Sequence, residues 1–166
     1  MSASFTYHAG WGELDSAASE EIIGFWLLQQ ALPSEQAARR RVAQVVTYAR
    51  SAQGKIAAVS TALPQIPAQL AQPVYFYRSF VAPEWRKSLV VFRLLKHSVK
   101  LLENDAREHD WPCIGVLLEL ENPRFLDKGR MPIWPGIDFT YIGKSPRNLE
   151  CRVHWFRDAR LKPFSP

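Results

Sequence analysis

The sequence predicts a mixed α/β (α+β) domain, in which a central, mostly antiparallel sheet carries helices on both faces. Strand-like and helix-like segments alternate between residues 74 and 121, and hairpin patterns lie on either side of them, over 45–63 and 138–156. Neither an internal repeat nor a low-complexity linker divides the 166 residues. Alternating segments with flanking hairpins are typical of a layered domain, so we expect one domain over residues 1–166.

Three segments carry helical periodicity. The first is residues 19–30 (SEEIIGFWLLQQ), with Ser19 as the expected N-cap. The second is residues 33–44, with Pro33 expected in the first helical turn and Glu35 near the positive end of the helix dipole. The longest pattern runs from Glu84 to His109. Its apolar face is expected to hold Val91, Leu95, Val99, Leu102 and Ala106, with Arg93, Lys96, Lys100 and Arg107 turned away.

The strands fall into a hairpin, a central pair and a second hairpin. Residues 45–50 and 55–63 are joined by a turn with Gly54, which predicts antiparallel neighbours. The aromatic run 74–83 and the apolar run 111–121 suit strands that are covered on both faces. Residues 122–129 predict a short helix before the last hairpin.

Composition narrows the class of protein. Apolar residues make up 47% and charged residues 22%, which is typical of a globular chain. The N-terminal residues lack a signal-peptide pattern and no run approaches the roughly 20 apolar residues of a membrane span, so we expect a cytoplasmic protein without a membrane partner. Cys113 and Cys151 are then expected to stay reduced.

Several site classes are disfavoured. The four histidines have no ligand spacing with the cysteines, so no metal site is expected. Gly-x-Ser-x-Gly, P-loop and dinucleotide fingerprints are missing from the sequence. Basic residues cluster at helix ends and are not interleaved with aromatic ones, which disfavours nucleic acid. The net charge of +5 suits an anionic ligand or partner.

The segment YFYRSFVAPEWRKSLVVFRLL (75–95) predicts a strand, a short loop and a long helix, with Arg86 and Lys87 at the start of the helix. A helix N-terminus exposes backbone N–H groups and the positive end of the helix dipole, and both favour phosphate. The sequence therefore predicts a phosphate-binding element here.

This segment and the order of elements resemble the GCN5-related N-acetyltransferase (GNAT) superfamily, whose phosphate loop has Arg or Gln, two residues, Gly, one residue, then Gly or Ala. The resemblance extends from about Glu20 to the C-terminus. Leu89 and Val91 stand at the two glycine positions, and both are alternatively read as helix core residues. The loop positions are Arg86, Lys87, Ser88, Leu89, Val90 and Val91.

The resemblance implies an acyl-CoA cosubstrate, most commonly acetyl-CoA. In the family its thioester lies where the strand before the loop splays from the next strand, here 74–82 and 113–121. Phe80 and Val81 would then join the loop residues in binding the cofactor. Asn122 takes the place of a family Asn near the cofactor, and is alternatively a helix N-cap before Pro123.

Acyl transfer from a thioester to an amine needs a base for the amine proton and an acid for the leaving thiolate. Glu119, at the end of the second strand, is the candidate base, and a solvent-facing strand end is its alternative. Tyr141 is the candidate acid, because the family uses a tyrosine, and sheet packing is its alternative. Water can serve in either role.

Two functions remain open from the sequence. The first is an acyl-CoA-dependent N-acyltransferase that acts on an unidentified amine. The second is a noncatalytic protein with the same fold that binds acyl-CoA or a protein partner. Leu89 and Val91 at the glycine positions favour the second, as does the lack of a tyrosine between residues 122 and 134.

Overall fold

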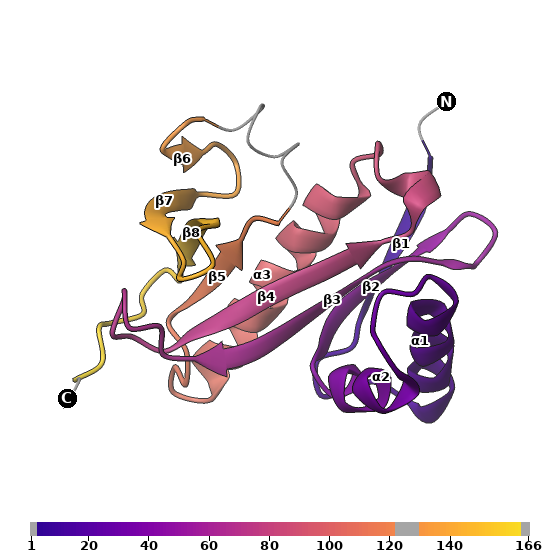
Figure 1. Ribbon diagram of the computed structural model, residues 1–166. Helices are drawn as coiled ribbons and strands as arrows, with labels where there is room; N and C mark the ends of the chain where they lie inside the picture. The colour runs from indigo at the N-terminus through magenta and orange to yellow at the C-terminus, as the bar shows by residue number, and fades with distance from the viewer. Residues whose placement is uncertain (1–2, 122–129, 164–166) are drawn as a thin grey trace. The chain divides into compact units, whose positions relative to one another are not determined.

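The computed structural model describes residues 3–121 and 130–163, and Figure 1 labels their helices and strands. The eight strands are hydrogen-bonded in the order β1-β2-β3-β4-β5-β8-β7-β6. In chain order the elements are β1 (Phe5–Ala9), α1 (Ser16–Leu28), α2 (Glu35–Val42), β2 (Val45–Ser51), β3 (Ile56–Gln65), β4 (Val74–Val81), the 3₁₀ turn η1 (Pro83–Trp85), α3 (Val90–Glu108), β5 (Gly115–Glu119), β6 (Ile133–Trp134), β7 (Phe139–Lys144) and β8 (Glu150–Trp155).

The predicted mixed and mostly antiparallel sheet is confirmed. β4 and β5 pair in parallel. The described ladders β1–β2, β2–β3, β5–β8, β6–β7 and β7–β8 are antiparallel. A parallel pair needs a long crossover, and α3 supplies it between β4 and β5.

The chain forms two compact units. Unit 1 comprises Met1–Ala62 and Arg78–Leu102, and unit 2 comprises Leu63–Tyr77 and Glu103–Pro166. The boundary falls inside β3, β4 and α3. Each unit is therefore built from segments that are distant in the sequence.

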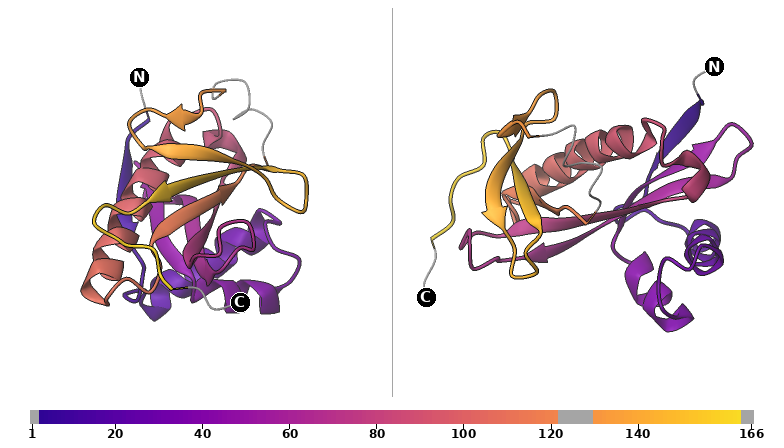
Figure 2. Two further views of the ribbon diagram at one scale, coloured as in Figure 1. Left: turned by 90° about the vertical axis from the view of Figure 1, so that its left-hand side faces the viewer. Right: turned by 45° about the horizontal axis from the view of Figure 1, so that its top comes forward.

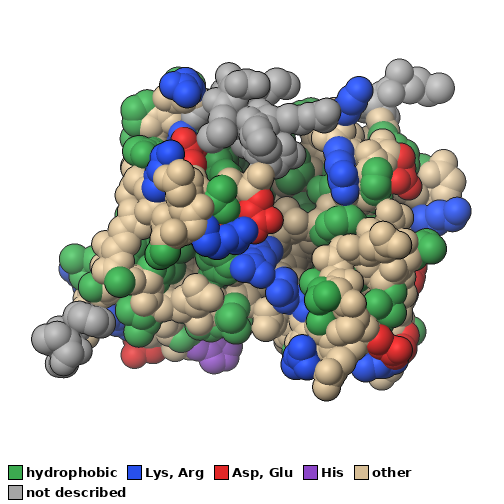
Figure 3. All heavy atoms as spheres, viewed as in Figure 1, with side chains coloured by type: hydrophobic (Ala, Val, Ile, Leu, Met, Phe, Trp, Pro, Cys, Tyr) green, Lys and Arg blue, Asp and Glu red, His purple; other side chains and the backbone are tan. Residues whose placement is uncertain are grey.

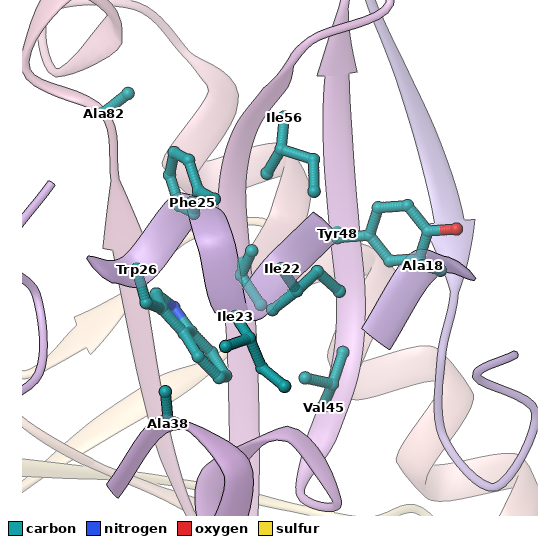
Figure 4. Close-up of a cluster of buried hydrophobic side chains, with 11 residues drawn as sticks. Ala18, Ile22, Ile23, Phe25, Trp26, Ala38, Val45, Tyr48, Ile56 and Ala82 are labelled. Atoms are coloured by element: carbon teal, nitrogen blue, oxygen red, sulfur yellow. The ribbon is translucent and has the colours of Figure 1, made fainter. Parts of the chain in front are cut away.

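The sheet of unit 1 is covered on both faces. α1 and α2 lie on one side of β2 and β3, and the first part of α3 lies on the other (Figures 1 and 2). Because side chains alternate along a strand, Tyr48 packs with α1 while Ala49 packs with Val90 and Leu94 of α3. Figure 4 shows the first cluster, in which Ile22 and Trp26 of α1 point toward the strands.

Side-chain caps start the two N-terminal helices. Asp15 Oδ1 accepts the Ala18 N–H at 2.7 Å, so α1 begins at Ser16 and the expected cap at Ser19 is wrong. Ser34 Oγ accepts the Ala37 N–H at 3.1 Å and caps α2. Pro33 therefore precedes the cap and does not lie in the first turn, as had been expected.

Three further predictions are corrected. β1 was missed, although Phe5, Tyr7 and Ala9 alternate with polar residues, because its pairing with β2 is nonlocal. α3 begins at Val90 and not at Glu84, since η1 and a turn occupy residues 83–89. Its buried face is centred on Leu94, Ser98 and Leu102, and Val91 and Val99 are only half-buried.

Unit 2 is organised around a buried arginine. Arg152 on β8 is about 1% exposed, and its guanidinium lies 4.5 Å from the centre of the Trp134 ring. Its Nη1 donates to the Met131 carbonyl oxygen at 2.8 Å, and its Nε donates to Glu150 at 2.9 Å. These bonds tie the chain before β6 to β8, because a buried guanidinium needs acceptors for its N–H groups.

Candidate functional site

The junction between β4 and α3 places two cations in the turn that precedes a 19-residue helix. Arg86 is exposed, and its Nε donates to the Val81 carbonyl oxygen at 3.2 Å. The same guanidinium lies 5.6 Å from the centre of the Phe80 ring. Lys87 follows and is exposed. The structure thus brings four of the predicted cofactor residues together within unit 1.

Some backbone N–H groups of this junction already have acceptors. The Ser88 N–H donates to the Trp85 carbonyl oxygen at 3.0 Å, and the Val90 N–H donates to Ser88 Oγ at 3.2 Å. The Arg86 N–H donates to the Pro83 carbonyl oxygen at 3.4 Å. The prediction that residues 86–91 direct their N–H groups toward an open cleft is therefore wrong for Arg86, Ser88 and Val90. Among the described residues, the N–H groups of Lys87, Leu89 and Val91 have no acceptor.

The side chains at the glycine positions differ in burial. Leu89 is 63% exposed, so its alternative interpretation as a core residue is wrong. Val90 instead packs with Leu94 in the core of unit 1. Val91 is half-buried in the first turn of α3. Leu89 therefore points away from the helix core at the place where the family has its first glycine.

The two strands of the expected cofactor gap are neighbours, as predicted. Pairing runs in parallel from Tyr75↔Val116 to Tyr77↔Leu118, all within unit 2. β5 ends one residue later, at Glu119. The divergence of the two strands beyond these pairs stays a prediction.

Glu119 is held by Arg147, a residue that was not predicted as part of the site. Its side chain is 11% exposed, and Arg147 Nη1 lies 2.6 Å from Glu119 Oε1 and 3.0 Å from Glu121 Oε1. The turn between β7 and β8 presents Arg147, whose N–H donates to Ser145 Oγ. The hydrogen bond that Arg147 donates to Glu121 and the negative charge of Glu119 raise the pKa of Arg147. The ion pair with Arg147 stabilises the charged form of the Glu119 carboxylate and therefore opposes its protonation.

Tyr141 lies on β7 with its ring 44% exposed and 5.9 Å from the Arg152 guanidinium. It is therefore not a buried packing residue. Its role as an acid and that of Glu119 as a base stay predictions. Asn122 lies outside the described residues. The Ser145-Pro-Arg-Asn turn between two strands was the available signal for Arg147, but sequence alone does not show that it faces the end of β5.

A further surface depression of the described residues lies on α2. A shallow depression on α2 is lined by Glu35, Gln36, Arg39 and Arg40, of which Arg39 is already paired with Glu35 and Glu20. Within residues 3–121 and 130–163, no group of three or more His, Cys, Asp or Glu side chains is placed to hold a metal ion. The described helices include none with the length and apolar character needed to cross a membrane. Lysine and arginine side chains lie among hydrophobic and uncharged ones on the face drawn in Figure 3.

Comparison with solved structures identifies the fold. A GNAT superfamily phosphinothricin acetyltransferase from Sinorhizobium meliloti, solved in complex with AcCoA, is similar with a TM-score of 0.61 at 12% identity, over 98% of this chain and 94% of that chain. A GCN5-related N-acetyltransferase from Kribbella flavida has a TM-score of 0.59 at 15% identity, over 91% and 97%. The ribosomal-protein-S18-alanine N-acetyltransferase from Escherichia coli has a TM-score of 0.57 at 15% identity, over 95% and 97%. No protein-family model and no curated protein matches the sequence.

Proposed function

We propose that this chain, which has the fold of the GNAT superfamily, is an acyl-CoA-dependent N-acyltransferase with acetyl-CoA as its donor. The observation that carries the proposal is the β4–α3 junction, where exposed Arg86 and Lys87 stand at a helix N-terminus. No acidic residue occurs between Arg86 and Leu102, so no carboxylate in this segment competes for the cations. Cytoplasmic placement and a single domain over residues 1–166 are part of the same proposal.

Phosphate suits this junction for two reasons. A helix N-terminus stabilises an anion through its dipole, and the N–H groups of Lys87, Leu89 and Val91 are available as donors. The Arg86 guanidinium can form two parallel bonds to phosphate oxygens, and each charge-assisted bond contributes about 1.5–3 kcal/mol. These residues would hold the pyrophosphate of the acyl-CoA.

The transfer itself forms a bond between the amine nitrogen and the acyl carbon and breaks the bond from that carbon to sulfur. A base takes the proton that the amine loses, and an acid gives a proton to the leaving thiolate. We assign the first role to Glu119 and the second to Tyr141, with water as the alternative in each. The acceptor is an amine that remains to be identified.

Two observations favour the noncatalytic alternative, in which the fold binds acyl-CoA or a protein partner without turnover. Leu89 and Val91 replace the glycines that allow close backbone approach to a pyrophosphate. The Oε1 atom of Glu119 is occupied by Arg147. Both features weaken a catalytic site without affecting the fold.

Titration with CoA and acetyl-CoA tests the proposal first. Arg86→Ala with Lys87→Ala should weaken binding, and the loss should shrink as salt rises, because salt screens exposed charges. Arg39→Ala with Arg40→Ala is the matched control, since it removes two exposed cations of α2. A parent protein that binds neither ligand at low salt would refute the phosphate site.

Thiol release from acetyl-CoA over a panel of amines then separates the two functions. Turnover that Glu119→Gln lowers at least about tenfold in kcat supports the base assignment. Binding without turnover on any amine supports the noncatalytic alternative.

A further inference from the structure

The excess positive charge of the protein lies entirely in unit 1. Unit 1 contains eleven lysines and arginines against six aspartates and glutamates, which accounts for the whole net charge of +5. Unit 2 contains ten of each and is formally neutral. The net positive charge of the protein is therefore a property of unit 1.

Within unit 1, one face of α3 gathers cations without acids. Arg93, Lys96 and Lys100 recur at helical spacing and are exposed. Phe92 on the same face is 37% exposed, and Leu89 directly before the helix is 63% exposed. We call these five residues the α3 stripe. The opposite face, with Leu94, Ser98 and Leu102, is buried.

Four of the six acids of unit 1 are engaged elsewhere. Glu20 and Glu35 both pair with Arg39. Glu21 pairs with Arg50 at 2.6 Å, and Asp15 caps α1. Among the described residues, no carboxylate pairs with the lysines of the α3 stripe. The stripe is thus a row of cations whose charge is not neutralised within the unit.

The flank of the stripe is fixed against the sheet. Arg93 lies beside the Tyr7 hydroxyl of β1, and the His97 ring stacks on the Tyr7 ring with centroids 4.5 Å apart. Ser98 on the buried side donates to the Leu94 carbonyl oxygen and contacts Ser60 of β3. A helix anchored on two sides holds the stripe in one orientation, which lowers the entropy that binding costs.

We propose that the α3 stripe docks an acidic, amphipathic segment of a partner protein. Charge complementarity favours carboxylates opposite Arg93, Lys96 and Lys100, and the exposed pair Leu89 and Phe92 favours an apolar side chain at one end. Single-stranded nucleic acid fits less well, because it prefers aromatic platforms along the strand and only Phe92 is aromatic. A membrane surface fits less well, because the main apolar face of α3 is packed on the sheet.

The size of the stripe sets the strength of the contact. Residues 89–100 span about 16 Å along the helix, which is small for a stable interface. Binding should therefore be transient and salt-sensitive, with charge reversal acting mainly through the association rate. The inference does not depend on acyl-CoA binding, because Lys96 and Lys100 lie outside residues 86–91.

The test uses a synthetic helical 20-residue peptide with glutamates at i, i+3 and i+7 and two leucines at one end. Its control peptide has glutamine at every glutamate position. Fluorescence anisotropy at low salt should detect the acidic peptide and not the glutamine peptide. Lys96→Glu with Lys100→Glu should weaken the acidic peptide at least about tenfold. Phe92→Ser should weaken it without changing its salt dependence.

The matched control is Arg40→Glu with Lys55→Glu, which changes the net charge of unit 1 by the same amount at other exposed positions. Equal loss in both double variants would mean that only net charge matters, and would overturn the proposal. A single-stranded oligonucleotide or phosphatidylserine vesicles bound more tightly than the peptide would also overturn it. So would the lack of any peptide binding at low salt, since the stripe would then be a solvated face. Circular dichroism confirms that each variant is folded.

Discussion

Ser88 offers a direct test of the phosphate site, because its side chain occupies an atom that the site would use. Ser88 Oγ accepts the Val90 N–H at 3.2 Å and donates to the Trp85 carbonyl oxygen at 2.7 Å. Ser88→Ala removes both bonds and leaves the Val90 N–H open to another acceptor. The variant should therefore be less stable alone but should bind the phosphates of CoA at least as well as the parent.

The magnitude follows from the two bonds. A typical hydrogen bond contributes about 0.5–1.5 kcal/mol net, and both groups regain water in this half-buried turn. We expect a loss of about 1 kcal/mol in the free energy of unfolding. For a chain of this length, that corresponds to a fall in Tm of about 2–4 °C.

Bound CoA should restore the stability that Ser88→Ala loses. The N–H groups of Lys87, Leu89 and Val91 are open in both proteins, whereas the Val90 N–H becomes a further donor to phosphate in the parent only when Ser88 Oγ leaves it. In the variant that N–H is open before CoA binds. The affinity of the variant for CoA should therefore rise by about 1 kcal/mol, which is roughly fivefold. By thermodynamic linkage the two proteins should approach the same Tm at saturating CoA.

Ser34→Ala is the matched control, since Ser34 Oγ caps α2 through the Ala37 N–H at 3.1 Å. It should lower Tm by a similar amount and should keep that deficit when CoA is added. Differential scanning fluorimetry with and without CoA measures all three proteins. A Ser88→Ala deficit that persists at saturating CoA would refute the reasoning, because the Val90 N–H would then have no role in phosphate binding. No effect of CoA on the parent would remove the site altogether.

Three further outcomes are expected. Arg152→Ala should lower the free energy of unfolding in urea by about 3–5 kcal/mol, because it leaves Glu150 and the Met131 carbonyl without their buried partner; a change below 1 kcal/mol would contradict this. Burial raises the pKa of Cys113 to about 12, whereas the thiol of an unfolded chain has a pKa near 8.5. Above pH 8.5 the unfolded chain loses this proton and the folded protein keeps it, so the free energy of unfolding should fall, by about 1.4 kcal/mol at pH 9.5. Urea titrations should show that the free energy of unfolding falls less steeply with pH above 8.5 in Cys113→Ala than in the parent. The same pH dependence in both proteins would contradict this prediction. Leu89→Gly with Val91→Gly should tighten acetyl-CoA binding about tenfold or more if the variant stays folded, as isothermal titration would show.

The parts of the fold that the sequence predicts well are those with local signals. The Gly54 turn predicts the hairpin of β2 and β3, and the apolar run before Glu119 predicts β5. β1 is five residues long and is stabilised by its ladder to β2, so its local pattern is weak. The start of α3 is misplaced because Pro83 suits a helical first turn, yet the Ser88 side chain bonds across the turn and delays the helix to Val90.

The candidate site shows the same division. The order of Arg86 and Lys87 after β4 follows from the sequence, but the structure places both in the turn before α3, four and three residues ahead of Val90. Arg147 was not predictable, because it reaches Glu119 across 28 residues through the register of β5 with β8. The sequence identifies a candidate base, but only the fold shows that an arginine already holds it.

The two missing glycines do not weigh equally against a phosphate site. Glycine is needed where a side chain would lie between the backbone and the ligand or where φ is positive. Neither Leu89 nor Val91 is among the described residues with positive φ, so neither backbone conformation demands glycine. Leu89 is mostly exposed and can turn in solvent, whereas Val91 is half-buried and its β-branched side chain has few rotamers in a helix. Val91 is therefore the side chain that restricts the approach of a phosphate to the backbone. The Val90 N–H is the donor that a phosphate cannot use while Ser88 Oγ accepts it.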